Sequence, residues 1–219
     1  MWKWDYLFEI LPQIASCLGV TISAALGGFV LALLLGLLFA VLLKVKYWFV
    51  KKPIEWFIEI VRSTPLLVQL YILYYVLPEY GILLSSFVTG VIGLGIHYST
   101  YLSEVYRSGI EAVPKGQWEA ADAIGFSKVQ TWIKIVIPQA VPPIIPIIGN
   151  YLVTMFKETP ILSAIALVEI MQKAKLLGAV SFRYIEGFTV VGVMFIIISY
   201  VATLLVQWVS RKASRRYTI

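Results

Sequence analysis

The sequence is poor in charged residues and almost without the side chains that carry metal or redox chemistry. Charged residues make up 14% of the 219 residues and hydrophobic residues 60%, whereas about a quarter of a typical soluble domain is charged. With one cysteine and one histidine, the chain forms no intrachain disulfide and falls short of a zinc-ligand set. It also lacks a G-x-x-x-x-G-K-[ST] phosphate loop. We therefore predict an integral membrane protein that needs no metal or cofactor, catalyses no reaction and hydrolyses no nucleotide itself.

Apolar segments of the length required to cross a bilayer, about 20 residues, recur five times. The expected spans are residues 16–43, 54–77, 83–110, 141–167 and 186–209. In the first span, Gly19, Ser23 and Gly27 follow one another at four-residue spacing, which predicts close helix packing. No soluble domain can be separated from these spans. Residues 1–219 are therefore expected to form a single all-α transmembrane domain.

The basic residues alternate between connections, and their distribution predicts an orientation. One set of connections holds twelve: Lys44, Lys46, Lys51, Lys52, Arg107, Lys115, Lys128, Lys134, Arg211, Lys212, Arg215 and Arg216. The other set holds four: Lys3, Lys173, Lys175 and Arg183. The richer set is expected on the cytoplasmic side, with the N-terminus outside and the C-terminus inside. Because these residues flank apolar segments, the net charge of +6 indicates topology and not nucleic-acid binding.

Residues 119–140 form the one long polar-to-amphipathic stretch between membrane-length segments. Residues 119–122 suit the first turn of a helix, and Gly125 is expected in a left-handed conformation or at a close contact. The apolar residues that follow are expected to lie on one helical face, and Pro138 to stop or kink the helix. These apolar residues are Val129, Trp132, Ile133 and Val136. Such a helix either docks into a partner's groove or lies on the lipid surface.

The same stretch resembles the coupling motif of ABC importer permeases, Glu-Ala-Ala, three residues, Gly, nine residues, Ile-x-Leu-Pro. The matching residues are Glu119, Ala120, Ala121, Gly125, Ile135, Ile137 and Pro138, with Ile137 in place of leucine. Residues 62–69, RSTPLLVQ, are similar to the RGTPLLVQ stretch of polar amino-acid permeases of the histidine/glutamine type, with Ser63 in place of glycine. Residues 101–121 resemble the same subfamily. The resemblance covers most of residues 62–167, and the outer spans match only in hydropathy.

This resemblance implies the transmembrane subunit of an importer for polar amino acids, with the type I permease fold, in a bacterial cytoplasmic (inner) membrane. A coupling helix within about residues 116–138 would dock onto separate cytoplasmic ATPase subunits. A second permease subunit, identical or different, and an extracytoplasmic solute-binding protein would complete the assembly. An ion-coupled carrier or a passive channel for small polar solutes is the alternative, which the coupling motif disfavours. A membrane enzyme is disfavoured because no paired catalytic groups occur.

Polar residues within the spans are candidates for binding the amino acid, since each is costly in lipid. Pro160 cannot donate to the Phe156 carbonyl, so the fourth span is expected to break near its middle. There Glu158 could hold an amino or guanidinium group, and Thr159 or local amides a carboxylate. Alternatively, Lys157 and Glu158 only stabilise the bend.

The third span offers a second set of candidates. His97, Tyr101 and Glu104 fall on one helical stripe that either faces a pore or forms an interhelical hydrogen-bond cluster. Glu104 is expected to pair with Arg107, and Gly90, Gly93 and Gly95 to be packing glycines. Gln69 and Asn150 either line the pore or join helices. The predicted substrate-binding residues are Glu158, Thr159, His97, Tyr101, Asn150, Gln69 and Lys157. Glu158, Glu104 and Tyr101 favour a basic amino acid such as arginine, lysine or histidine over neutral or acidic ones.

Overall fold

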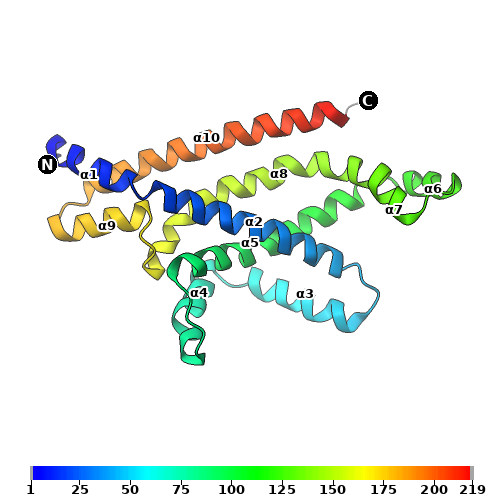
Figure 1. Ribbon diagram of the computed structural model, residues 1–219, viewed down its shortest axis with the longest axis horizontal. Coiled ribbons are helices and arrows are strands. Elements are labelled where there is room, and N and C mark those ends of the chain that lie inside the picture. Colours follow the sequence, from blue (N-terminus) through cyan, green and yellow to red (C-terminus); the bar gives the residue numbers. More distant parts are fainter. Residues whose placement is uncertain (1, 218–219) are drawn as a thin grey trace.

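Helices make up all regular secondary structure of the described residues. The computed structural model describes the backbone of residues 2–217 and the side chains of residues 2–213. The side chains of Arg215 and Arg216 therefore lie outside the described residues. Figure 1 shows long helices lying along the molecule's long axis. The elements are α1 (Trp4–Ala15), α2 (Leu18–Leu42), α3 (Trp48–Arg62), α4 (Leu66–Tyr71), η1 (Ile72–Val76), η2 (Leu77–Tyr80), α5 (Ser86–Glu111), α6 (Lys115–Ala123), α7 (Lys128–Thr131), η3 (Trp132–Val136), α8 (Ile137–Glu158), η4 (Thr159–Ile165), α9 (Ile170–Ser181) and α10 (Ile185–Tyr217).

Three helical segments in this part of the chain are long and apolar enough to cross a membrane: Trp4–Leu42, Lys128–Ile165 and Ile185–Ala213. A fourth candidate is the pair Trp48–Arg62 and Leu66–Tyr80, which is bent by 106° at its break. These segments include all or nearly all of four predicted spans, namely residues 16–43, 54–77, 141–167 and 186–209. The third predicted span forms α5, which is not apolar enough to be among them. The all-helical membrane architecture is confirmed.

The polarity of α5 is explained by its position in the bundle. α5 packs along α2 and also contacts α3, α4 and α8. Its buried hydroxyls donate to carbonyls three or four residues earlier, as Ser103 Oγ does to the Thr100 carbonyl at 2.7 Å. Because these hydrogen bonds are made within the helix and the surroundings are protein, α5 does not need the uniformly apolar surface of a lipid-facing span.

Small side chains allow α2 and α5 to approach closely. The small residues that α2 buries recur every four positions: Ala24, Gly28, Ala32, Gly36 and Ala40. A Cβ atom at Gly36 would lie 2.9 Å from the Leu102 Cβ and 3.0 Å from the Ser99 carbonyl oxygen. At Gly95 on α5, an added Cβ would lie 2.5 Å from Leu31. The two helices therefore pack with their backbones nearly in contact, as small-residue stripes permit in membranes.

The predicted stripe on the first span is one helical position away from the real one. Nothing lies within 4 Å of a Cβ added at Gly19, and Ser23 is exposed, although Gly27 would contact Val91 at 3.2 Å. The prediction of packing glycines in the third span is confirmed. Besides the contact at Gly95, added Cβ atoms at Gly90 and Gly93 would lie 3.2 Å from Leu162 and 2.5 Å from Leu70.

The fourth span changes from α-helix to 3-10 helix at Thr159, next to Pro160, which confirms the predicted break. The break lies at the end of α8 and not near the middle of the span, because the helical segment begins far earlier, at Lys128. The 3-10 helix η4 then ends at Ala166, which has a left-handed backbone with φ of 57°. The break therefore lies at one end of a long, continuous helix.

A buried carboxylate begins α9. Glu169 accepts the backbone N–H groups of Met171 at 2.9 Å and Gln172 at 2.7 Å, so it satisfies two donors that a helix N-terminus leaves without intrahelical partners. Its side chain is fully buried. Burial raises the pKa of this carboxyl from 4.5 to about 7, although the two backbone N–H groups and Lys175 favour the ionised form.

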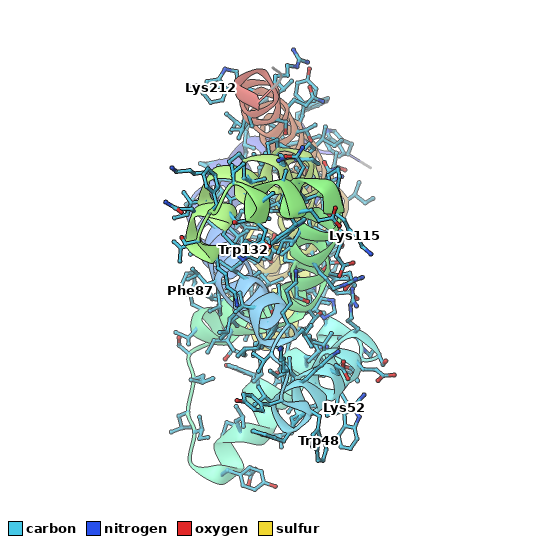
Figure 2. All side chains as sticks on the ribbon, turned by 90° about the vertical axis from the view of Figure 1, so that its right-hand side faces the viewer. Trp48, Lys52, Phe87, Lys115, Trp132 and Lys212 are labelled. Carbon is cyan, nitrogen blue, oxygen red and sulfur yellow. The ribbon has the colours of Figure 1, made fainter. Side chains whose placement is uncertain are left out.

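The molecule's two ends differ in content. The N-terminus, α9 and the start of α10 lie at one end, and α6, α7, the α2–α3 connection and the far end of α10 at the other (Figure 1). At this second end the Lys44 ammonium lies 5.7 Å from the centre of the Trp132 ring. Figure 2 looks onto it, with Lys52, Lys115 and Lys212 in view. The connections rich in lysine and arginine, which were predicted to share one side of the membrane, thus lie at the same end of the molecule.

We predict that the Gly36→Ala substitution destabilises the bundle. Overpacking costs about 1–3 kcal/mol, which outweighs the gain of up to about 1 kcal/mol in helix propensity. Gly19→Ala on the same helix is the matched control, because its new methyl group meets no neighbour within 4 Å. Thermal unfolding in detergent, followed by tryptophan fluorescence, should show a lower Tm for Gly36→Ala only. Equal Tm values for the two variants would contradict the close packing of α2 and α5.

We also predict that the stability of the α9 region falls as the pH rises. The pKa of Glu169 is higher in the folded protein than in the unfolded chain. Its contribution is therefore complete below pH 4.5 and is lost as the pH passes about 7. The upper limit of this loss is about 3 kcal/mol. Hydrogen exchange of the α9 amides between pH 5 and 8, corrected for intrinsic rates, should show the loss in the wild type and a weaker dependence in Glu169→Gln. An identical pH dependence in both would refute the assignment.

Candidate functional site

An open cavity of about 550 Å³ lies where the α3–α4 break, α5 and the α8–η4 junction meet. Helices are interrupted on two of its sides, so backbone groups as well as side chains face it. Its lining residues are Arg62, Ser63, Thr64, Pro65, Leu66, Leu67, His97, Tyr101, Lys157, Glu158 and Ile161. The cavity has the size of typical small-molecule sites, about 300–1,000 Å³.

The break between α3 and α4 follows from the sequence Ser63-Thr64-Pro65. Pro65 takes an extended backbone conformation with ψ of 140° and precedes α4, and a residue before proline is disfavoured in a helix. The Gln69 side-chain amide closes the break, because its Nε2 donates to the carbonyls of Val61 at 2.7 Å and Thr64 at 3.1 Å. Gln69 therefore satisfies carbonyls that the end of α3 leaves exposed.

Charged and aromatic groups converge on the cavity from three elements. The Arg62 guanidinium lies 4.9 Å from the centre of the Tyr101 ring, within the range of a cation–π interaction. Lys157 and Glu158 reach the cavity from the end of α8. None of the ion pairs in the described part of the chain involves Arg62, Lys157 or Glu158. The cavity therefore brings together two cations and one carboxylate.

The structure brings four of the seven predicted substrate residues into this cavity, namely His97, Tyr101, Lys157 and Glu158. The His97 Nδ1 atom lies 3.2 Å from Gln69 Oε1, and its ring centre lies 5.3 Å from that of Tyr101. Both alternatives for this stripe of α5 therefore hold. His97 forms an interhelical hydrogen bond with Gln69, and His97 and Tyr101 also line the cavity. Outside the cavity, the expected pairing of Glu104 with Arg107 is confirmed.

The other three predicted residues do not line the cavity. Gln69 is not among the lining residues, and its side-chain amide donates hydrogen bonds to the backbone carbonyls of Val61 and Thr64. Thr159 is fully buried, and its Oγ1 donates to the Phe156 carbonyl at 2.8 Å. That carbonyl is the one that Pro160 cannot serve, so Thr159 stabilises the break. Asn150 is exposed on α8, about two turns before the break.

Arg62 is the charged residue of the cavity that was not among the predicted substrate-binding residues. It was noted only as the first residue of the stretch 62–69. A usable signal existed, because an arginine directly before Ser63-Thr64-Pro65 stands at a helix end beside a break. Intramembrane cations at such positions are functional candidates.

Residues of the coupling motif lie at the basic end of the molecule, in α6, α7, η3 and the start of α8. Ala121 is buried, whereas Glu119 and Ala120 are exposed, and Ile135 and Pro138 are half-buried. The Trp118 and Trp132 rings meet edge to face, 5.5 Å apart. Gly125 has φ of 74° with no neighbour near its Cα, so the left-handed alternative is confirmed and the close contact is not. A capping box between Ser127 and Gln130 then starts α7.

Two predictions about this region are wrong. Residues 119–122 do not open a helix, because α6 begins at Lys115, directly after Pro114, and its first turn carries no acidic residue. Of the two alternatives for Pro138, that it stops the helix is wrong, and that it kinks the helix stays a prediction. Pro138 occupies the first turn of α8, where its missing N–H is tolerated, and the π-helical η3 precedes it.

The predicted single apolar face is also split. Val136 is buried and Trp132 half-buried in a cluster with Val113 and Ala140. In contrast, Val129 and Ile133 are 66% and 61% exposed. The wider turn of η3 shifts the periodicity, so the outward row consists of Val129, Ile133 and Ile137, with Ile124 nearby and also exposed. We call these four residues the apolar row.

Comparisons with known proteins agree with this arrangement. The family model "Binding-protein-dependent transport system inner membrane component" matches residues 32–215. The probable amino-acid ABC transporter permease protein y4tG of Sinorhizobium fredii is 46% identical over 73% of this chain and 69% of its own length. The probable amino-acid ABC transporter permease protein PatM of Vibrio harveyi is 31% identical over 97% of both chains.

A solved structure has the same fold. It is described as the crystal structure of an amino acid ABC transporter with histidines, and it matches with a TM-score of 0.90 and 29% identity. The match covers 97% of this chain and 99% of that chain. The fold similarity therefore includes the cavity and the basic end of the molecule.

Proposed function

The chain belongs to the family of binding-protein-dependent transport system inner membrane components, and we propose that its cavity at the broken helices receives the transported amino acid. It is a multi-pass permease subunit of a polar amino-acid ABC importer in a bacterial inner membrane, and a separate ATPase subunit hydrolyses ATP. The observation that carries the proposal is the convergence of Arg62, Tyr101 and Glu158 on one cavity, where neither the guanidinium nor the carboxylate forms an ion pair with another described residue.

Side chains in the cavity can contact both charged groups of an amino acid and the cationic side chain of a basic one. Arg62 can bind the α-carboxylate, because a guanidinium forms two parallel hydrogen bonds with a carboxylate. Glu158 can then accept hydrogen bonds from an amino or guanidinium group, and the Tyr101 ring can hold a cation. Because Arg62, Lys157 and Glu158 together carry a net charge of +1, the proposal of a basic amino acid rests on the contacts that Glu158 and Tyr101 offer and not on the net charge of the cavity. The solved relative with histidines is consistent with this class of substrate.

The apolar row is the surface proposed to dock onto the ATPase subunit. Exposed isoleucine and valine side chains at helical spacing fit an apolar groove on a partner. Asp122, Lys128 and Phe126 line a hollow of about 320 Å³ beside the two tryptophans. A partner that docks here would meet apolar side chains at the centre and polar side chains around them. Protein interfaces usually have this composition.

The same proposal fixes the orientation and the remaining partners. The basic end, where the apolar row lies, faces the cytoplasm by the positive-inside rule. The opposite end, with α9 and the N-terminus, faces the solute-binding protein. Because the cavity is open on one side in the isolated chain, a second permease subunit, identical or different, is proposed to complete the pore there.

Replacing Glu158 with glutamine should weaken the response to a cationic amino acid. A hydrogen bond to a charged group contributes about 1.5–3 kcal/mol, so half-maximal stimulation of ATP hydrolysis should require about tenfold more arginine or histidine. The transporter reconstituted with its ATPase and binding protein is the system to measure. Glu104→Gln is the matched control, because that carboxylate pairs with Arg107 outside the cavity. An unchanged concentration dependence in Glu158→Gln would disprove the contact.

Replacing Ile133 with aspartate should weaken ATPase binding. Burying an isoleucine side chain contributes about 1.5–3 kcal/mol, so the affinity for the ATPase subunit should fall by about tenfold or more. Co-purification of the ATPase at several concentrations measures this. Ile82→Asp serves as the control, because Ile82 is also exposed but lies outside the apolar row. Equal retention of the ATPase by both variants would exclude the apolar row as the docking surface.

A further inference from the structure

A recessed apolar groove of about 560 Å³ lies between α2 and α10, with α8 as its floor. All residues that line it are apolar. α8 and α10 meet closely at its floor, where a Cβ atom added at Gly149 would lie 2.2 Å from Val206. The groove is therefore a hollow between packed helices, and not only the outer surface of a single helix.

The groove faces away from the solute cavity. On α8, Phe156 lines the groove and Glu158 lines the cavity. Two helical residues are about 200° apart around the axis, so these side chains leave α8 on opposite sides. A second permease subunit that completes a pore around the cavity would lie on the other side of α8. The groove is thus left to the lipid.

The two ends of the groove differ. Beyond the end of the groove nearer the N-terminus, α1 packs against α10 through a cluster that includes Ile10, Ile14 and Val190. At the other end the lining reaches Val209. Lys212 follows one turn later and shares a face of α10 with Leu205 and Val209, because residues three, four and seven positions apart lie on one stripe.

Lys212 and its neighbours have the character of a membrane interface. The Lys212 ammonium lies 5.2 Å from the centre of the Trp208 ring, and Trp208 is exposed. Figure 2 shows Lys212 on α10 at the basic end of the molecule. Tryptophan rings gather at the headgroup level, and basic side chains near helix ends attract anionic lipids. The apolar groove and Lys212 therefore follow one another along the same face of α10.

We propose that this groove binds an acyl chain of an anionic phospholipid whose headgroup is held by Lys212. The groove supplies an apolar bed for the chain, and its open end supplies a positive charge where the headgroup would lie. The acyl chain extends along the groove from the basic end, where Lys212 lies. A lipid bound there would hold α2 and α10 at a fixed separation beside the floor helix α8.

Native mass spectrometry of the intact transporter, with its ATPase subunits, tests this proposal. Dioleoyl phosphatidylglycerol and dioleoyl phosphatidylcholine are titrated separately, so that only the headgroup differs. A cation near the headgroup contributes about a fivefold preference for the anionic lipid. Lys212→Gln should remove this preference. Arg211→Gln, which neutralises an adjacent residue on another face of α10, should keep it.

A second variant tests the groove itself. Val201 lines the groove and is 49% exposed, so Val201→Trp should fill it and reduce retention of both lipids at least fivefold. The proposal is overturned by an absence of preference in the wild type, or by equal effects of Lys212→Gln and Arg211→Gln. Unchanged retention in Val201→Trp would also overturn it. Dissociation of the two permease subunits by Val201→Trp would instead make the groove a subunit interface.

Discussion

The close contact between α2 and α5 is the constraint on which the rest of this structure depends. Small residues every four positions on α2 let the two backbones nearly touch. α5 is thereby held among other helices, where its serines, threonines and His97 need not face lipid. This position also fixes one wall of the solute cavity. A looser contact would expose polar groups to hydrocarbon, where each costs free energy unless it is hydrogen-bonded.

Sequence reasoning succeeded where a residue acts through its own backbone chemistry. Pro160 broke the fourth span because proline has no N–H, and Gly125 adopted the left-handed conformation that glycine permits. It failed where the outcome depends on neighbours. The small-residue stripe on α2 was placed one position away, since two interleaved sets of small residues occur and only packing selects one. Likewise, η3 is a π-helical turn, which is wider than an α-helical turn, and Ile133 therefore points outward. A pattern based on 3.6 residues per turn does not predict this change.

The candidate site shows the same division. Four of seven selected side chains face the cavity: Lys157 and Glu158 lie beside the break that Pro160 predicts, and His97 and Tyr101 lie on one stripe of α5. Gln69 and Thr159 were selected for their polarity, but they satisfy backbone carbonyls near the two breaks, at Val61 and Phe156. In a membrane such carbonyls have no water to bind, so nearby polar side chains serve them first. Polarity within a span alone therefore does not distinguish a residue that lines the cavity from one that satisfies a carbonyl at a helix break.

α8 links the proposed docking surface to the cavity, and its form suits that task. It is a continuous helix of 22 residues, about 33 Å long at 1.5 Å per residue. Irregular turns occur at both of its ends, with η3 near the apolar row and η4 beside Glu158. α8 remains helical although Pro142, Pro143 and Pro146 lie inside it, so in the proposed assembly one helix connects the docking surface to the cavity. Displacement alone does not select a direction of transport, however, because ATP can shift the equilibrium only as far as its affinity differs between the two states of the assembly. The permease therefore supplies the mechanical connection, and the ATPase subunits supply the free-energy difference.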